Sequence, residues 1–131
     1  MSASLAQKLQ LKPGQRMAVL NAPQGYLDQV AAEMESITVL AQAAGKPDAV
    51  LLFVNKLGEA ERLVPRAIRA IKSDGLLWIA YPKGTSRFKT DVNRDRLWEA
   101  LKPTGWRPVR QIALDEVWSA MRFRPEASVG K

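Results

Sequence analysis

Polar and glycine residues follow the apolar segments of this sequence, at the points where buried strands are expected to end. They are Asn21, Pro23, Gly25 and Tyr26 after the first segment, Asn55 after the third, and Tyr81 and Lys83 after the fourth. Ligands of open α/β sheets bind beyond the carboxyl ends of the strands, which makes these residues candidates for ligand binding. Asn21 and Gly25 also precede a helical segment, whose first N–H groups suit an anion. The alternative is a tight strand-to-helix turn that uses the same residues only for its geometry.

A basic segment follows the fourth apolar segment. Its candidate binding residues are Lys83, Arg87, Lys89 and Asp91, with Phe88 among them and Arg94 and Arg96 shortly after. Guanidinium groups and an aromatic ring suit the backbone of a nucleic acid or a single strand. The sequence contains no recognisable nucleic-acid-binding motif, however, and Asp91 and Asp95 can neutralise part of the charge. The alternative is a solvated loop with local ion pairs.

The segment 115–124 suits an interface better than a catalytic site. Ser119 would need a base to act as a nucleophile, and the sequence contains no histidine. Trp118 and Arg122 belong to residue types that are enriched at protein interfaces. A hairpin that exposes them at the edge of a sheet would suit a homodimer. The alternative places Trp118 in the core.

The absence of histidine and cysteine narrows the chemistry of this chain. Histidine is the usual acid or base near neutral pH, and cysteine is the strongest natural nucleophile. Zinc, copper and haem lose their usual ligands, and no Asp-x-Asp-x-Asp-Gly run is present for a hard cation. We therefore assign no catalytic residue and no metal site. An enzyme would have to use Lys, Asp or Tyr at the ends of the strands.

The net charge of +7 is unevenly distributed. Residues 1–65 hold six Lys/Arg and six Asp/Glu, whereas residues 66–131 hold 14 and seven, so the second half carries the whole excess. Such an asymmetry indicates a basic face for a small anion, an acidic protein or a nucleic acid. Surface charge that only keeps a small domain soluble is the alternative.

The length of 131 residues predicts one domain over 1–131, with 125–131 as a flexible tail. No apolar run approaches the roughly 18–20 residues that a membrane span needs. The N-terminus lacks the basic-then-apolar order of a signal peptide, and cysteine is absent. We expect a cytoplasmic protein that does not contact a membrane.

The apolar pattern predicts helices and strands in alternation. Strands are expected over 17–20, 37–40, 48–54, 75–81, 109–114 and 117–124, and helices over 4–11, from 27 and from 57. A fourth helix contains Leu97 and Leu101, with Asn93 or Asp91 as its cap. Pro65 predicts a kink in the third helix or a later start for it. Trp78 and Trp98 are expected on core faces. Two strands, 48–54 and 75–81, lack polar alternation, which is typical of a parallel sheet covered on both faces.

These elements predict an α/β fold, a three-layer Rossmann-like sandwich. Right-handed crossovers place helices on both faces of one mostly parallel sheet. An antiparallel hairpin at the C-terminus closes that sheet.

Residues 48–124 resemble the final part of a class I methyltransferase, with a buried strand, a helix, a second strand, a helix and an antiparallel hairpin in that order. The whole chain also resembles a small bacterial family of unknown function. The residues that carry this second resemblance are Leu20-Asn21-Ala22-Pro23 with Gly25-Tyr26, Lys89-Thr90-Asp91, and Asp115 with Trp118-Ser119-Ala120. Both resemblances imply a Rossmann-like fold, and the second implies no activity.

The sequence departs from the methyltransferase pattern where those enzymes hold S-adenosylmethionine. They use a glycine-rich turn after the first strand and an acidic residue near the end of the second. Here the turn has one glycine and Pro23, which lacks an N–H, and the second strand is followed by Ala41 and Gln42. No phosphate-binding Gly-x-x-x-x-Gly-Lys run is present either. We therefore expect no cofactor.

The leading hypothesis is a non-catalytic, methyltransferase-like binding module for an anionic small ligand or an acidic protein partner. One alternative is sequence-independent nucleic-acid binding through the basic C-terminal half. The other is an enzyme that uses Lys, Asp or Tyr at the strand ends.

Overall fold

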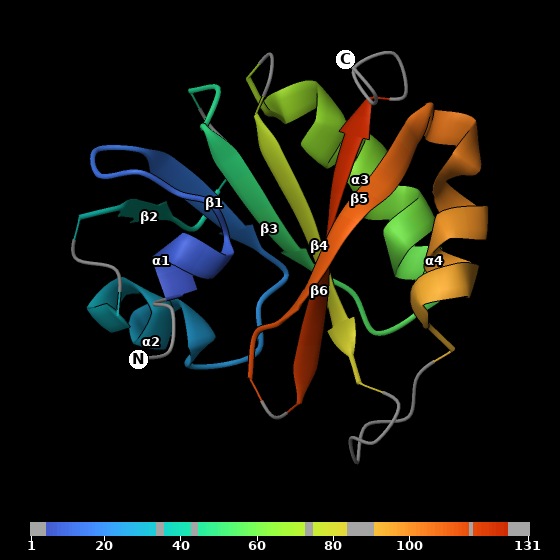
Figure 1. The fold of residues 1–131 in the computed structure, drawn as a ribbon, viewed down its shortest axis with the longest axis horizontal. Helices are drawn as coiled ribbons and strands as arrows, with labels where there is room; N and C mark the ends of the chain where they lie inside the picture. The colour runs from blue at the N-terminus through green and yellow to red at the C-terminus, as the bar shows by residue number, and fades with distance from the viewer. Residues whose placement is uncertain are drawn as a thin grey trace.

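The computed structural model describes residues 5–33, 36–42, 45–72, 75–83, 91–115 and 117–125 (Figure 1). Six strands form one sheet in the order β2-β1-β3-β4-β6-β5. Their bounds are β1 Arg16–Leu20, β2 Thr38–Leu40, β3 Ala49–Phe53, β4 Leu76–Pro82, β5 Trp106–Ala113 and β6 Trp118–Pro125. β2, β1, β3 and β4 run parallel, whereas β6 pairs antiparallel with both β4 and β5. This arrangement confirms the predicted fold class.

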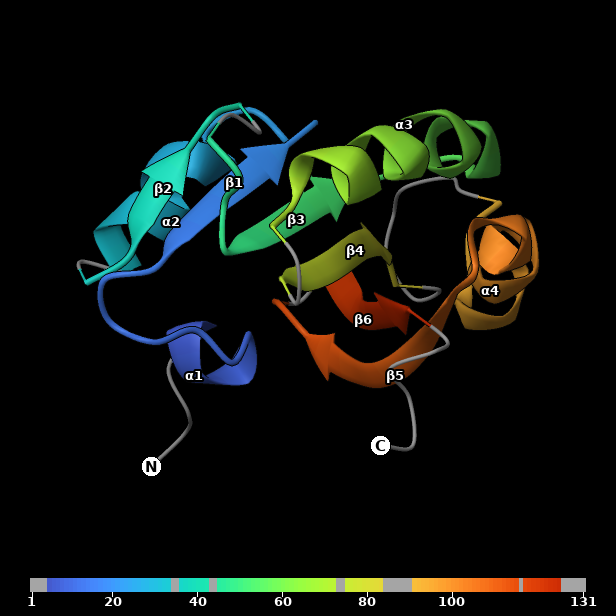
Figure 2. The same ribbon diagram turned by 90° about the horizontal axis from the view of Figure 1, so that it is seen from above.

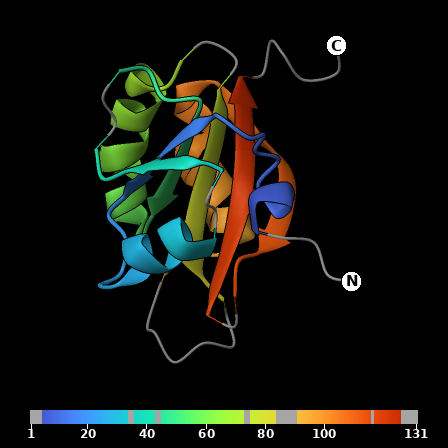
Figure 3. The same ribbon diagram turned by 90° about the vertical axis from the view of Figure 1, so that its left-hand side faces the viewer.

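Helices cover both faces of the sheet. Their bounds are α1 Leu5–Lys8, α2 Tyr26–Glu33, α3 Leu57–Ala70 and α4 Arg94–Leu101, followed by the short 3₁₀ helix η1 Lys102–Thr104. Figures 2 and 3 show α3 and α1 on opposite sides of the sheet. Buried residues of α3 and α4 pack in one apolar cluster, and Leu9, Tyr26 and Val30 pack in the other. No described helix is long and apolar enough to cross a membrane.

The two central strands are buried on both faces, as their continuous apolar runs predicted. All five residues of β3 are buried, and six of the seven residues of β4 are buried. Parallel strands between two helical layers have no solvent face, which explains why the polar alternation is missing. Trp78 is fully buried, and its indole N–H donates to the carbonyl of Leu9, 3.1 Å away.

Three expectations on the elements are corrected. The third helix begins at Leu57 and contains Pro65 without interruption, so it has no late start. Trp98 is 39% exposed rather than on a core face, because Leu97 and Leu101 fill the buried side of the short helix α4. Trp118 is only 6% exposed rather than displayed at an edge, because β5 forms the edge of the sheet outside β6.

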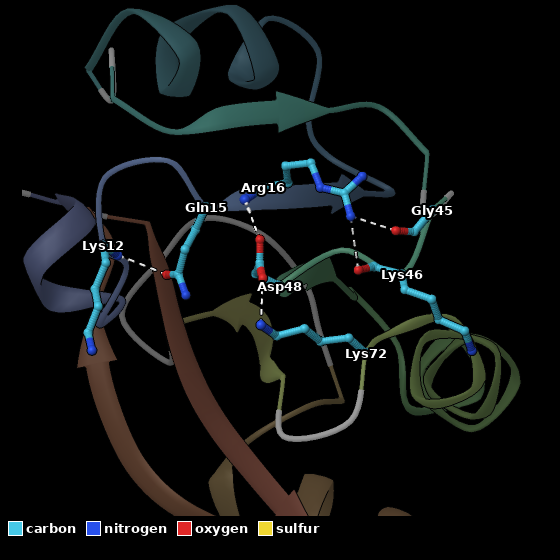
Figure 4. A network of polar contacts seen from close by, with 7 residues as sticks. All are labelled: Lys12, Gln15, Arg16, Gly45, Lys46, Asp48 and Lys72. Carbon is cyan, nitrogen blue, oxygen red and sulfur yellow. Dashed lines mark hydrogen bonds and ion pairs between the residues drawn. The ribbon is translucent and has the colours of Figure 1, made fainter.

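Asp48 lies at the amino-terminal ends of β1 and β3, and its carboxylate links both strands to the segment after α3 (Figure 4). One carboxylate oxygen accepts a hydrogen bond from the N–H of Arg16 at 2.8 Å, and the other lies 2.6 Å from Nζ of Lys72. The Lys72 ammonium and then the Arg16 N–H lower the pKa of Asp48. The network fixes the start of β1 and β3 against the segment that follows α3.

Candidate functional site

The N-terminus of α3 lies at the carboxyl ends of the parallel strands, and carboxylates of this chain satisfy it. Oδ1 of Asp91 accepts a hydrogen bond from the N–H of Leu57 at 2.8 Å. Oε1 of Glu59 accepts from the N–H groups of Asn55 and Lys56, at 2.7 and 3.2 Å. Carboxylates in these positions bind orphan N–H groups and complement the positive end of the helix dipole. The chain itself therefore fills the anion site that this helix offers.

Glu59 is held in its charged form. Burial alone would raise the pKa of its carboxyl above the ordinary value of 4.5, but three hydrogen bonds outweigh burial and lower the pKa. They come from the Asn55 N–H, the Asn21 side chain and the Lys56 N–H. A carboxylate with a lowered pKa is a poor proton donor near neutral pH. Glu59 is therefore a structural group at this rim.

The turn after β1 is held by hydrogen bonds within the chain, although Asn21 and Gly25 are exposed. Nδ2 of Asn21 donates to the carbonyl of Phe53 at 2.8 Å and to Oε2 of Glu59 at 3.1 Å. Gly25 has φ +80°, a conformation that favours glycine, and the carbonyl of Pro23 accepts from the N–H of Tyr26 at 3.0 Å. Tyr26 starts α2 and is 7% exposed, with its ring edge-on to Phe53. The turn closes the end of the sheet.

A polar hollow of about 350 Å³ lies at the end of β4, beside the start of α4. We name it the strand-end hollow; it is lined by Tyr81, Lys83, Asn93, Arg94, Asp95, Gln111 and Ser119. Four elements build it: Tyr81 pairs with Ser119 across β4 and β6, Gln111 comes from β5, and Asn93 caps α4 by accepting from the N–H of Arg96 at 2.9 Å. Its lining carries two cations and one carboxylate.

Tyr81 and Gln111 form the polar floor of the strand-end hollow. Nε2 of Gln111 donates to the Tyr81 hydroxyl at 2.8 Å. A phenol that accepts one hydrogen bond still carries a proton that it can donate. Burial raises the pKa of Tyr81, against smaller lowering effects of Arg94 and Gln111. The phenol is therefore protonated at neutral pH and suits the role of a donor to an anion.

The cations of the strand-end hollow differ in exposure. Nε of Arg94 lies 3.7 Å from Oδ1 of Asp95, with side chains 67% and 85% exposed, so this contact holds Arg94 only weakly. Lys83 is half-buried, and its backbone N–H donates to the carbonyl of Val117 at 2.7 Å. The backbone of Lys83 is thus held at the end of β4, and the ion pairs of the described residues do not include its ammonium group.

The structure brings some predicted site residues together and separates others. Tyr81 and Lys83 share the strand-end hollow, whereas Asn21, Asn55 and Asp91 serve the N-terminus of α3 and the ends of β1 and β3. Arg87 and Lys89 lie outside the described residues. Trp118 lies in the core, and Nη1 of Arg122 donates to Oε1 of Gln10 at 2.6 Å.

No group of three or more acidic side chains in the described ranges could hold a metal ion.

Gln111 is a lining residue that the sequence did not reveal. An uninterrupted alternation along β5 would put Gln111 on the same face as Arg107, away from Tyr81. A register shift between Pro108 and Arg110 reverses this order and places Gln111 on the face of Tyr81. The proline in an edge strand was the available signal, because prolines in sheets mark edges and bulges.

Replacing Asp91 by alanine should lower the free energy of unfolding by about 1 kcal/mol, the typical effect of removing a helix cap. The N–H of Leu57 would lose its carboxylate partner. Urea unfolding measures the change, and Asp95→Ala is the matched control, because Asp95 is 85% exposed and should change stability far less. Equal stability of Asp91→Ala and the wild type would contradict a capping role.

No protein-family model and no curated protein matches this sequence. Solved structures share its fold: a SAM-dependent methyltransferase from Aquifex aeolicus gives a TM-score of 0.57 at 10% identity, over 91% of this chain and 86% of that chain. A ribosomal protein L11 methylase from Lactobacillus delbrueckii subsp. bulgaricus gives 0.56 at 9% identity, over 92% and 74%. A protein in the NADB-Rossmann superfamily from Streptococcus agalactiae gives 0.56 at 13% identity, over 95% and 69%.

At these identities the likeness concerns the fold. It confirms the predicted resemblance to Rossmann-like methyltransferases at that level. The resemblance to a bacterial family of unknown function finds no matching family model.

The rim of the sheet does not suit the adenosyl cofactor that such folds hold. A bound cofactor needs backbone N–H groups and glycines after the first strand. Here Pro23 lacks a backbone N–H, and Gly25 is the only glycine of the turn. The side-chain amide of Asn21 already donates to Phe53 and Glu59. The residues after β2 supply no carboxylate for ribose hydroxyls. The residues present therefore do not fit S-adenosylmethionine.

Proposed function

We propose that this chain is a non-catalytic, methyltransferase-like binding module that takes an anionic group in the strand-end hollow. The anion belongs to a small ligand or to an acidic side chain of a protein partner. The observation that carries the proposal is the pairing of Lys83 and Arg94 above a floor of Tyr81 and Gln111. Cations with neutral donors beneath them are the groups that recognise a carboxylate or phosphate.

The hydrogen bonds of the carboxylates at the N-terminus of α3 support binding rather than catalysis. A general acid or base needs a pKa near the working pH. The pKa of Glu59 is lowered, and both Glu59 and Asp91 are bound to backbone N–H groups. Tyr81 is held protonated by burial. Neither Glu59 nor Tyr81 is thus poised to take up a proton from a substrate.

The first test is binding of inorganic phosphate and of small carboxylates by the purified chain. Arg94→Gln combined with Lys83→Gln should weaken binding of the anion that binds best by about tenfold, since two partly solvated charged contacts contribute about 1.4 kcal/mol together. Isothermal titration at moderate salt measures the affinity. The double variant should keep its fold, because Arg94 is exposed and the backbone N–H of Lys83, which bonds to Val117, is unchanged by the substitution.

The matched control is Arg62→Gln combined with Lys56→Gln, which removes two exposed cations at α3 and should leave the affinity unchanged. An equal loss of affinity in both double variants would assign binding to the net charge and would contradict a site at the strand-end hollow.

A further inference from the structure

The outer hairpin carries four arginines on one face. In the antiparallel register of β5 and β6, Arg107 lies opposite Arg124 and Arg110 lies opposite Arg122. Directly opposite residues of an antiparallel pair share a face, with Cβ atoms about 4.5–5.5 Å apart. We name these four residues the arginine block. Arg107 and Arg110 are exposed, and Arg122 and Arg124 are half-buried.

A β-bulge creates the arginine block. The register shifts between Pro108 and Arg110, so that Pro108 pairs with Phe123 and Arg110 with Arg122. Without the shift, Arg110 would share the face of Pro108 and Phe123, the face against which α3 and α4 pack. The extra residue turns Arg110 to the side of Arg107. Bulges that re-aim a side chain in this way are common beside functional sites.

The arginine block costs stability, because like charges directly opposite each other in a sheet repel. In the described part of the chain, ion pairs join Lys72 to Asp48, Arg94 to Asp95 and Lys102 to Glu99. None of them reaches the block. Among the described residues, the four arginines therefore have no acidic partner that would compete with an external anion.

Arg122 is the member of the arginine block whose guanidinium is held in place. Its Nη1 is held by Oε1 of Gln10 beside α1, and its Nε is buried without a hydrogen-bond partner among the described residues. Burial, and then the charges of Arg124 and Arg110, lower the pKa of Arg122. The guanidinium is thus fixed in place by a neutral amide, close to two other positive charges.

We propose that the arginine block binds the phosphate backbone of a nucleic acid without sequence preference. Planar guanidinium groups bind phosphate oxygens in pairs, and four of them on one sheet face can meet successive phosphates. Neutralising phosphates gives affinity without reading bases.

A protein partner fits this face less well. Protein interfaces rely on buried aromatic and apolar anchors at their centre. The exposed large apolar side chains of the described residues are Trp98, on α4, and Val109, at the bulge itself. Trp98 lines a hollow beside Arg110, at one border of the arginine block, and Val109 is not aromatic.

Most of the arginine block lies away from the strand-end hollow. Gln111 and Ser119 of the hollow lie near the turn of the hairpin and on the face of Tyr81, whereas Arg107, Arg122 and Arg124 lie toward the other end and on the opposite face. Arg110 lies nearer, because it lines a second hollow together with Arg94, Asp95 and Gln111. Substitutions at Arg107 and Arg124 therefore test the arginine block independently of the strand-end hollow.

The test is the salt dependence of binding to a short fluorescent DNA duplex of mixed sequence, measured by anisotropy with the full chain. Four phosphate contacts predict a slope of about −3.6 for the logarithm of the association constant against the logarithm of salt concentration. Affinity should then fall on the order of a hundredfold between about 50 and 200 mM salt. Arg107→Gln combined with Arg124→Gln should reduce the slope to about −1.8.

The same double variant should keep or raise its melting temperature, because it removes a pair of like charges that face each other. If the variant binds the duplex more weakly but melts at the same or a higher temperature, the loss of binding comes from the missing arginines and not from a damaged fold. The matched control is Arg66→Gln combined with Arg69→Gln on α3, where both side chains are exposed. It removes the same charge and should leave the slope near that of the wild type.

Three results would overturn the proposal. The salt dependence could fall as much in the control variant as in the block variant, which would show that binding depends on net charge alone. Binding of the duplex by the wild type could be absent or indifferent to salt. Polyglutamate could displace the duplex at equal charge concentration, which would make the arginine block a docking surface for an acidic protein.

Discussion

Replacing Trp118 by alanine should lower the free energy of unfolding by about 3–5 kcal/mol, the range measured for large aromatic residues removed from protein cores. Trp118 is 6% exposed, and its ring meets Phe53 edge-on at a centroid distance of 4.9 Å. Phe53 meets Tyr26 in a similar way at 4.7 Å, so the substitution opens a cavity beside the two remaining rings. Urea unfolding followed by circular dichroism measures the loss.

Trp98→Ala is the matched control for that experiment. Trp98 is 39% exposed, and its described polar neighbour is Nζ of Lys102, 5.3 Å from the ring centroid. Its removal should cost only about 0.5–1 kcal/mol, the contribution of an exposed cation–π contact. If Trp118→Ala instead kept full stability and reduced the size of an oligomer, Trp118 would be an interface residue and its place in the core would be wrong.

Replacing Glu59 by alanine should lower the free energy of unfolding by about 2–3 kcal/mol, because hydrogen bonds to a charged group contribute more than neutral ones. The carboxylate accepts from the N–H groups of Asn55 and Lys56 and from the Asn21 side chain. Its loss would remove one acceptor from all three donors, although Asn21 would keep its hydrogen bond to the carbonyl of Phe53. Glu61→Ala, on the same helix and exposed, is the control and should have little effect.

The stability that Glu59 contributes should depend on pH. Its pKa is lower in the folded chain than the ordinary value of 4.5, so folding favours the ionised form. The contribution is complete above that ordinary value and is lost as pH falls through the folded pKa. Wild-type stability should therefore drop more than that of Glu59→Gln between about pH 5 and pH 3. Parallel pH profiles for the two proteins would contradict this role.

The sequence was sufficient for the fold because its two central strands are buried on both faces. Continuous apolar runs at 48–54 and 75–81 identified β3 and β4, and the spacing of apolar residues identified α3 in spite of Pro65. The antiparallel hairpin followed from two alternating segments around Asp115, which accepts from the N–H groups of Val117 and Trp118. These signals are local in the chain.

The candidate site depends on contacts between distant residues, and a single sequence does not record them. Asn21 reaches Glu59, and Asp91 reaches Leu57, across more than 30 residues. Nothing local in the sequence indicates that these polar groups satisfy each other instead of a ligand. The bulge at Pro108 shifts the face of every later residue of β5, and so decides the neighbours of both Gln111 and Arg110.

The central claim is that the strand-end hollow, and not a cofactor turn, is the binding site of this fold. Thermal shift with inorganic phosphate, nucleotides, small carboxylates and S-adenosylmethionine, at low and raised salt, tests it most directly. A small anion at about 100 times its dissociation constant should raise the melting temperature by about 10 °C, at both salt levels in the wild type and less in Lys83→Gln combined with Arg94→Gln. A saturable shift with S-adenosylmethionine at micromolar concentration, unaffected by that double variant, would contradict the account.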